Sequence, residues 1–278
     1  MSGSPQGLLQ AENIIPDLEG QFYLEILRDV HDKLCPERYL EIGVHTGQSL
    51  FLSTARTIGI DPNFHFQGGS LEQWVAKIGE LHLYRQTSDE FFSAHDPSKI
   101  LGGPLGFAFL DGLHHCEVLL RDFANVERFC DEQSVVALHD CLPVEPGIAA
   151  RVFDPDIIKV EAHKTWWAGD VWKTALILKR FRPDLAMVAL DAAPTGLILI
   201  ANLDASNRLI SSEYDRFVDE MERMDLTKIG TSHLFDELEV KSTSSWLEEL
   251  EFLRKAKRNT STPPTRAGTF LSRFLPKF

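Results

Sequence analysis

Short apolar runs alternate with more polar, helix-like stretches along the first half of the chain. Five runs that end near Gly, Asp or His are interpreted as strands, at 38–43, 57–61, 81–85, 106–110 and 134–139. The intervening segments are interpreted as helices, at 47–56, 70–79, 88–95 and 117–130. Such alternation predicts βαβ units built around a parallel sheet.

The pattern changes after the fifth strand. Residues 141–170 contain several prolines and the pair Trp166-Trp167 without clear periodicity, which is typical of a long functional connection or lid. A helix at 171–181 and the strand-like runs AMVALD and GLILIANL follow, with the short turn AAPT between the two runs. We therefore expect an α/β fold with a Rossmann-like, doubly wound, mostly parallel seven-stranded sheet and an antiparallel edge hairpin.

The ends of the chain differ in composition from its middle. Residues 1–17 are rich in Gly, Ser, Pro and Gln and predict a flexible arm, followed by a main domain over 18–240. In the segment 241–278, a capping-box spacing at Ser245–Glu248 predicts a docking helix. Beyond it, residues 254–278 carry seven Lys or Arg and no acid, which fits a solvated tail or a basic arm for an anionic partner or membrane.

Composition narrows the class of protein. The 278 residues are 44% hydrophobic, enough for a globular core, and the formal net charge of −13 argues against a nucleic-acid partner. The four cysteines form no CxxC pair, so neither a zinc knuckle nor a redox motif is indicated. We expect a cytoplasmic protein with no signal peptide and no membrane span.

The strongest chemical signal is a glycine-containing turn after the first predicted strand. Glu41, Gly43, Gly47 and Ser49 lie in the sequence EIGVHTGQS, where a strand gives way to a helix and a parallel sheet presents its ligand crevice. A dinucleotide site would show G-x-G-x-x-G, whereas this spacing is E-x-G-x-x-x-G, which favours a ligand without pyrophosphate. Asp61 ends the second strand, where a carboxylate can accept both hydroxyls of a ribose.

The order of motifs EIGVHTGQS, GIDPN, TSDEFF, FLDGLHHCEVLLRDF and ALHDC resembles class I S-adenosylmethionine-dependent methyltransferases. It is most similar to the small-molecule O-methyltransferases of the macrocin and cephamycin type, over about residues 38–200. The resemblance implies that Glu41 and Gly43 hold the methionine end of the cofactor. It also implies that Asp61 binds the ribose and that Ser88 with Asp89 binds the adenine edge. Strand-end capping and, for Ser88, a helix N-cap are the alternative interpretations.

A second group of polar residues follows the fourth and fifth predicted strands. Asp111, His114 and the pair His139-Asp140 are expected around one crevice. The resemblance implies that Asp111 faces the methionine amino group or a metal. The resemblance implies that Asp111, His139 and Asp140 hold a divalent cation, Mg or Mn. His139 stands where an acid is common and Cys116 where Tyr is common, so His114 or His139 acting as a general base remains open beside the metal.

Three functions remain open at this stage. A methyltransferase acting on a hydroxyl of a sugar or other small-molecule acceptor is favoured, either as a monomer or as a homodimer. A catalytically inactive scaffold that retains the nucleoside site is the second. An NAD-dependent oxidoreductase is the third, because it shares the fold class and the position of Asp61 but needs a different glycine spacing.

Overall fold

One seven-stranded sheet, in the order β3-β2-β1-β4-β5-β7-β6, organises the computed structural model, which describes residues 14–66 and 71–245. Strands β1 to β5 are parallel, and β7 runs antiparallel to both β5 and β6. The predicted Rossmann-like sheet with an antiparallel edge hairpin is therefore confirmed. The strands are β1 (Arg38–Ile42), β2 (Arg56–Ile60), β3 (Leu81–Tyr84), β4 (Leu105–Leu110), β5 (Cys130–His139), β6 (Ala186–Leu190) and β7 (Leu197–Ala201).

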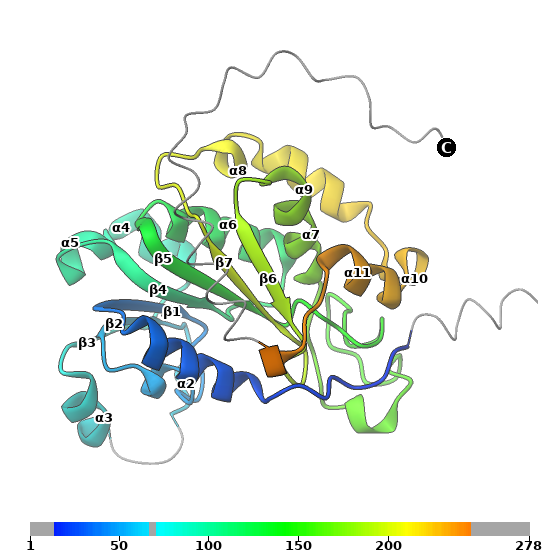
Figure 1. Cartoon of the computed structure of the whole chain (residues 1–278), viewed down its shortest axis with the longest axis horizontal. Coiled ribbons are helices and arrows are strands. Elements are labelled where there is room, and N and C mark those ends of the chain that lie inside the picture. The colour runs from blue at the N-terminus through cyan, green and yellow to red at the C-terminus, as the bar shows by residue number, and fades with distance from the viewer. Residues whose placement is uncertain (1–13, 67–70, 246–278) are drawn as a thin grey trace, which may run out of the picture.

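Helices cover both faces of the sheet (Figure 1). Helix α2 (Tyr23–Leu34) packs on one face through Ile26, Leu27 and Val30, in an apolar cluster with residues of β1, β4 and β7. The opposite face is covered chiefly by α6 (Cys116–Glu127), α7 (Trp172–Phe181) and α9 (Tyr214–Glu222). The remaining helices are α3 (Leu71–Ile78), α4 (Ser88–Ala94), α5 (Pro97–Leu101), α8 (Leu209–Ser212), α10 (Leu226–Ile229) and α11 (Thr231–Leu238).

Two predicted helices have other bounds than expected, and several helices were not predicted. Only the 3-10 helix Leu50–Leu52 forms within the expected helix 47–56, because the Ser53 hydroxyl accepts the Ala55 N–H and the chain becomes extended. The helix expected at 117–130 ends at Glu127, since Cys130 already pairs with Leu105 and begins β5. The predictions also missed α5 and the short helices α8 to α11.

The segment 141–170, called the lid below after the prediction from the sequence, has a small apolar core of its own. Val144, Ile148, Ile158 and Ala168 are buried together and pack against Ile15, Leu18 and Trp166. The buried His163 lies between two carboxylates, 2.8 Å from Glu145 and 2.6 Å from Asp17. These contacts fasten the lid to the segment that precedes α2.

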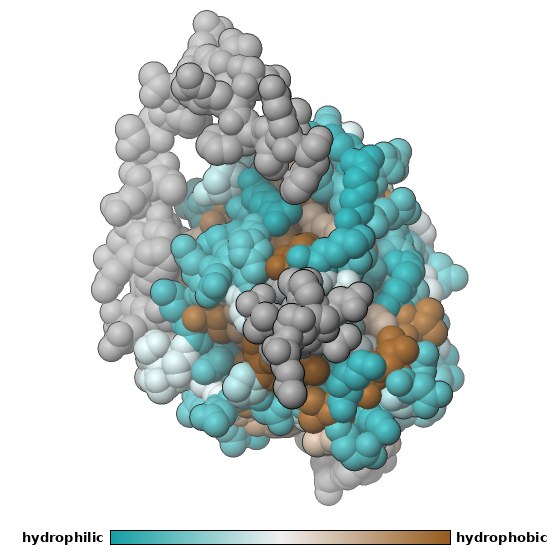
Figure 2. Space-filling view, turned by 90° about the vertical axis from the view of Figure 1, so that its right-hand side faces the viewer, coloured by the Kyte–Doolittle hydropathy of each residue, from teal (hydrophilic) through white to brown (hydrophobic). Residues whose placement is uncertain are grey.

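Three further observations concern the surface of the protein and the ends of the chain. Hydrophilic residues predominate on the face shown in Figure 2, with hydrophobic residues gathered in its lower half. Among the residues that the structure describes, no helix is both long and apolar enough to cross a membrane. Residues 1–13 of the predicted arm and the predicted docking helix and tail beyond Ser245 lie outside the described residues.

Helix α2 carries a buried histidine that makes stability depend on pH. The His31 ring lies edge-on to Tyr39 and Phe107, and neither ring nitrogen has a hydrogen-bond partner among the described residues. Burial, aided by the charge of Lys77, lowers the pKa of His31 to about 4, from 6.5 in an unfolded chain. The unfolded state therefore binds more protons between pH 4 and 6.5, and stability falls as the pH falls through this window.

We expect His31→Leu to lose less stability than the wild type on acidification. Urea unfolding at pH 7 and pH 5 measures how much free energy of unfolding each protein loses on acidification. For a pKa shift of this size, the wild type should lose about 2 kcal/mol more than the variant. Other titrating groups are common to both proteins and cancel in the comparison. Equal losses in both proteins would show that His31 takes up its proton in the folded state.

Candidate active site at the carboxyl ends of the strands

A cavity of about 560 Å³ opens at the carboxyl ends of β1, β2, β4 and β5. Strands β1 and β4 are neighbours in the sheet, but the chain leaves them toward opposite edges, so a crevice forms where their following loops diverge. Most of the predicted site residues line this cavity: Gly43, Asp61, Ser88, Asp89, Asp111, His114, His139 and Asp140. The tertiary structure thus brings together residues spread over about 100 positions of the sequence.

The glycine turn lies directly against the loop after β4. Gly43 has φ +89°, and a Cβ placed on it would lie 1.8 Å from the Asp111 carbonyl oxygen. Its N–H donates to the Ile60 carbonyl at 2.9 Å, which fixes the turn to β2. Glycine is required here by both the backbone angle and the close approach of the two loops.

Glu41, Ser49 and Gly47 lie behind this turn and are not among the residues that line the cavity. The buried Glu41 carboxylate accepts hydrogen bonds of 2.6 Å from both the Tyr39 and the Ser49 hydroxyls. Burial raises the pKa of Glu41 to about 8, although these two hydrogen bonds act in the opposite direction. Gly47, at φ +81°, packs against the Phe51 ring. All three residues shape the turn from inside.

Asp61 follows β2 and lies at the cavity wall, as the sequence predicted. One carboxylate oxygen accepts the His45 N–H at 2.8 Å and the other accepts the Asn63 N–H at 2.7 Å. His45 adopts φ +41°, so the carboxylate stabilises an uncommon backbone conformation in the glycine turn. Asp61 is only 8% exposed and lines the cavity.

Ser88 and Asp89 start α4 at the other end of the cavity. The N-cap of α4 is Thr87, whose side chain forms a capping box with Glu90, so the alternative interpretation of Ser88 as the N-cap is wrong. Ser88 instead hydrogen-bonds to the buried Asp122, whose pKa burial raises to about 7. Asp89 lies at the rim and forms a two-bond ion pair with Arg121 at 2.5 and 2.6 Å.

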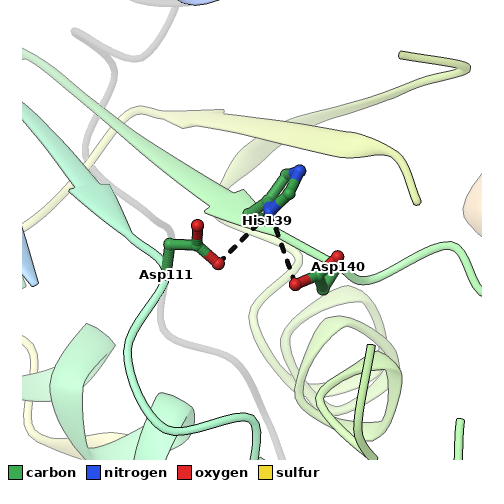
Figure 3. Close-up of side chains that lie close together, drawn as sticks. All are labelled: Asp111, His139 and Asp140. Atoms are coloured by element: carbon green, nitrogen blue, oxygen red, sulfur yellow. Dashed lines mark hydrogen bonds and ion pairs between the residues drawn. The ribbon is translucent and has the colours of Figure 1, made fainter. Parts of the chain in front are cut away.

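Four side chains form a closed ring in which carboxylates and imidazoles alternate. His139 Nδ1 lies 3.2 Å from Asp111 Oδ1 and 3.4 Å from Asp140 Oδ2 (Figure 3). His114 Nε2 lies 3.5 Å from the same Asp111 oxygen and 3.2 Å from the same Asp140 oxygen. The ligand atoms of Asp111, His139 and Asp140 all lie within 4.8 Å of one another. These three residues are therefore close enough together to hold a divalent cation.

The carboxylates of this ring strongly raise the pKa values of its two histidines. Burial alone would lower the pKa of His139, but the carboxylates of Asp140 and Asp111 outweigh it and raise the pKa to about 10. The pKa of His114 is raised to about 9, again against the effect of burial, by its hydrogen bond to Asp111 and the charge of Asp140. Both imidazoles are therefore protonated near neutral pH in this arrangement. A histidine in that state cannot accept a proton until the surrounding negative charge is neutralised.

Contacts that the sequence did not reveal hold this ring in place. The Trp167 carbonyl of the lid lies 2.8 Å from His114 Nδ1, which directs Nε2 toward the two carboxylates. The Thr195 hydroxyl donates to Asp140, which itself adopts φ +61°. The Tyr23 ring at the start of α2 lies against His139, with ring centroids 4.1 Å apart. These contacts join segments 53 or more residues apart, so no local sequence pattern could reveal them.

Trp166, Trp172 and Asp170 lie near the site but do not line the cavity. Trp172 is buried in the main core, and Trp166 stacks on His163, so neither forms a wall of the cavity. Asp170 does not cap α7, whose N-cap is Val171, but accepts the Cys116 N–H at the start of α6 at 2.8 Å. The lid thereby fixes the helix that follows the Asp111–His114 loop.

The fold and the site define a Rossmann-like α/β protein with a ligand cavity at the point where the strand order reverses. Residues 40–141 match the family model of a methyltransferase domain, a stretch that contains the glycine turn, Asp61 and all four members of the ring. This match supports the methyltransferase class. No curated protein matches the chain significantly in sequence.

Among solved structures, the chain is similar in fold to several methyltransferases. One from Podospora anserina, bound to S-adenosylhomocysteine, is 13% identical, with TM-score 0.45 over 66% of this chain and 78% of that chain. The O-methyltransferase of tomaymycin synthesis from Streptomyces achromogenes, in complex with S-adenosylmethionine, is 15% identical, with TM-score 0.44 over 66% and 80%. An O-methyltransferase from Bacillus cereus is 12% identical, with TM-score 0.44 over 72% and 88%. The likeness is too distant to indicate a substrate.

Proposed function

We propose that this protein is an S-adenosylmethionine-dependent methyltransferase that methylates a hydroxyl of a small molecule, such as a sugar or a secondary metabolite. The observation that carries the proposal is one cavity that joins the Gly43 turn and Asp61 to the ring of Asp111, His114, His139 and Asp140. The Gly43 turn and Asp61 suit a nucleoside without pyrophosphate, and the ring suits the activation of a hydroxyl. The methyltransferase match over the same residues supports it.

In this proposal the cofactor lies along the ends of β1, β2 and β3. Asp61 accepts hydrogen bonds from the ribose hydroxyls, while Ser88 and Asp89 adjoin the adenine. The methionine end lies over Gly43, where the absence of a side chain leaves room for it. Glu41, Gly47 and Ser49 act on the cofactor by holding the turn in shape.

Methyl transfer takes place beside the ring of carboxylates and imidazoles. The acceptor oxygen attacks the methyl carbon of the sulfonium, the carbon–sulfur bond breaks, and S-adenosylhomocysteine and the methyl ether are formed. Asp111, His139 and Asp140 would hold a divalent cation, which when bound lowers the pKa of the acceptor hydroxyl. The same cation would neutralise the carboxylates beside His114, which lines the cavity and is then placed to accept the hydroxyl proton.

The kind of cation follows from the donor atoms of the ring. One imidazole nitrogen and two carboxylates are a softer set than the all-oxygen shell that Mg²⁺ prefers, so we expect Mn²⁺, Co²⁺ or Zn²⁺ to bind more tightly than Mg²⁺. His139→Asp should shift the preference toward Mg²⁺ by about tenfold or more. Competition measured through the Mn²⁺ electron paramagnetic resonance signal tests this without an acceptor, and an unchanged preference would remove His139 from the ligand set.

Asp61→Asn should weaken binding of S-adenosylhomocysteine by about 1.5 to 3 kcal/mol, because a charged hydrogen-bond acceptor for the ribose is lost. The asparagine keeps the size of the side chain and one oxygen for the His45 N–H, so the glycine turn is largely preserved. Calorimetry measures the affinity, and thermal unfolding reports whether the turn is intact. An unchanged affinity would exclude Asp61 from the ribose site.

Calorimetric titration with S-adenosylmethionine, S-adenosylhomocysteine and NAD tests the proposal as a whole. We expect saturable binding of the two sulfur nucleosides and none of NAD. Binding of NAD alone would replace the proposal with an oxidoreductase. Nucleoside binding without turnover of any hydroxyl acceptor, with and without added Mn²⁺ or Mg²⁺, would favour a catalytically inactive scaffold.

A further inference from the structure

A second cavity, of about 550 Å³, opens between α6 and the segment 208–216 and shares no lining residue with the cofactor cavity. Four arginines line it: Arg121 in α6, Arg128 directly after α6, and Arg208 and Arg216 from the facing segment. The acidic residues of its lining are Glu213 and Asp215. We refer to it below as the arginine cleft.

This concentration of arginine contrasts with the charge of the rest of the protein. The net charge of −13 includes the seven positive charges of residues 254–278, so residues 1–253 carry a net charge of −20. Within the arginine cleft the lining residues carry a net charge of +2. A positive cleft in an acidic domain attracts anions.

Two of the four arginines, Arg128 and Arg208, form no ion pair with a carboxylate of the described residues, although the charge of Arg208 helps to lower the pKa of Asp204. Arg208 donates to the carbonyl oxygens of Ala205 and Asn207, both at 2.7 Å, and Arg128 lies over the Phe129 ring. By contrast, Arg216 pairs with Glu213 at 3.2 Å. Arg128 and Arg208 therefore keep guanidinium N–H groups for a ligand.

We propose that the arginine cleft binds a small oxyanion with two or more negative charges. A guanidinium presents paired N–H donors whose geometry matches phosphate and carboxylate oxygens, and arginines on both walls can hold one anion between them. Phosphate esters and polycarboxylates share this chemistry. The volume of the cleft suits a small molecule of either class.

Arg121 links the arginine cleft to the cofactor cavity. Its Nε and Nη2 bind Asp89 at the rim of the cofactor cavity, while its Nη1 donates to the Tyr214 hydroxyl at 2.6 Å in the cleft. An anion that draws Arg121 toward the cleft weakens its ion pair with Asp89. The anion should then change the affinity for the cofactor, and this consequence alone rests on the proposed function.

Titration calorimetry at constant ionic strength, with pyrophosphate and citrate as probes, tests the site. The full-length protein saturated with S-adenosylhomocysteine is used, so that the cofactor cavity is filled. We expect at least one probe to bind, and to bind about tenfold or more weakly to Arg128→Ala/Arg208→Ala. The relative affinities of pyrophosphate and citrate separate a phosphate site from a carboxylate site.

The matched control is Arg28→Ala/Arg223→Ala, which removes two exposed arginines outside the cleft. It loses the same charge and should bind the probe like the wild type. Equal weakening in both double variants, or no binding of either probe by the wild type at about 10 mM, would overturn the proposal. If the protein does not bind S-adenosylhomocysteine, the same titration on the unliganded protein tests the cleft separately from the proposed function.

Discussion

Asp140→Ala should lower the rate of methyl transfer by about 1,000-fold, equivalent to about 4 kcal/mol of transition-state stabilisation. Asp140 contacts both imidazoles of the ring, so its removal takes away a ligand and a negative charge beside the acceptor hydroxyl. It is distant in the sheet from Asp61 and α4, because β4 and β1 separate β5 from β2. Affinity for S-adenosylhomocysteine should therefore stay within about twofold.

Two variants accompany this measurement. Asp156→Ala removes an exposed carboxylate of the lid and should leave both rate and affinity unchanged. Thr195→Val removes the hydrogen bond that orients Asp140 and should give an intermediate loss of rate. Parallel losses of rate and cofactor affinity in Asp140→Ala would point to structural damage and remove Asp140 from the acceptor step.

Gly43→Ala should weaken binding of S-adenosylhomocysteine by about 30-fold or more and destabilise the fold by about 3 kcal/mol. Part of the cost is the positive φ, about 1 to 2 kcal/mol for a residue with a side chain. The larger part is the contact with the Asp111 carbonyl oxygen, which the loops after β1 and β4 can relieve only by moving apart. Calorimetry and urea unfolding measure the two effects.

Gly79→Ala is the control for this substitution. Gly79 has a similar φ of +78°, but a Cβ there would meet nothing within 4 Å. It should cost only the conformational strain of about 1 to 2 kcal/mol and leave cofactor affinity unchanged. If the two alanine variants behave alike, the close approach of the two loops does not shape the cofactor site.

The lid combines two tasks in this protein. Its Trp167 carbonyl orients His114, and its Asp170 carboxylate caps the helix that follows the His114 loop. The lid is in turn held to the segment before α2 by Asp17, His163 and Glu145. The geometry of the ring therefore depends on segments on both sides of residues 40–141, the stretch that matches the methyltransferase domain.

The strand ends carried most of the information that the sequence held about the site. In a parallel sheet, a residue that follows an apolar run lies at the carboxyl edge whatever the neighbours are, so Gly43, Asp61, Asp111 and Asp140 could be placed from local pattern alone. The same alternation of runs predicted the sheet and its edge hairpin. Helix ends such as Ser53 and Thr87 were less predictable, because side-chain hydrogen bonds compete with helix formation there.

Only the tertiary structure decided which polar groups meet. The Trp167 carbonyl, the Thr195 hydroxyl and the Tyr23 ring reach the site from the lid, the hairpin turn and the first helix, across long sequence separations. It also placed Glu41 and Ser49 behind the turn and assembled the arginine cleft from two helical segments. Periodicity encodes which face of an element is buried, whereas contacts between distant elements depend on how those faces pack.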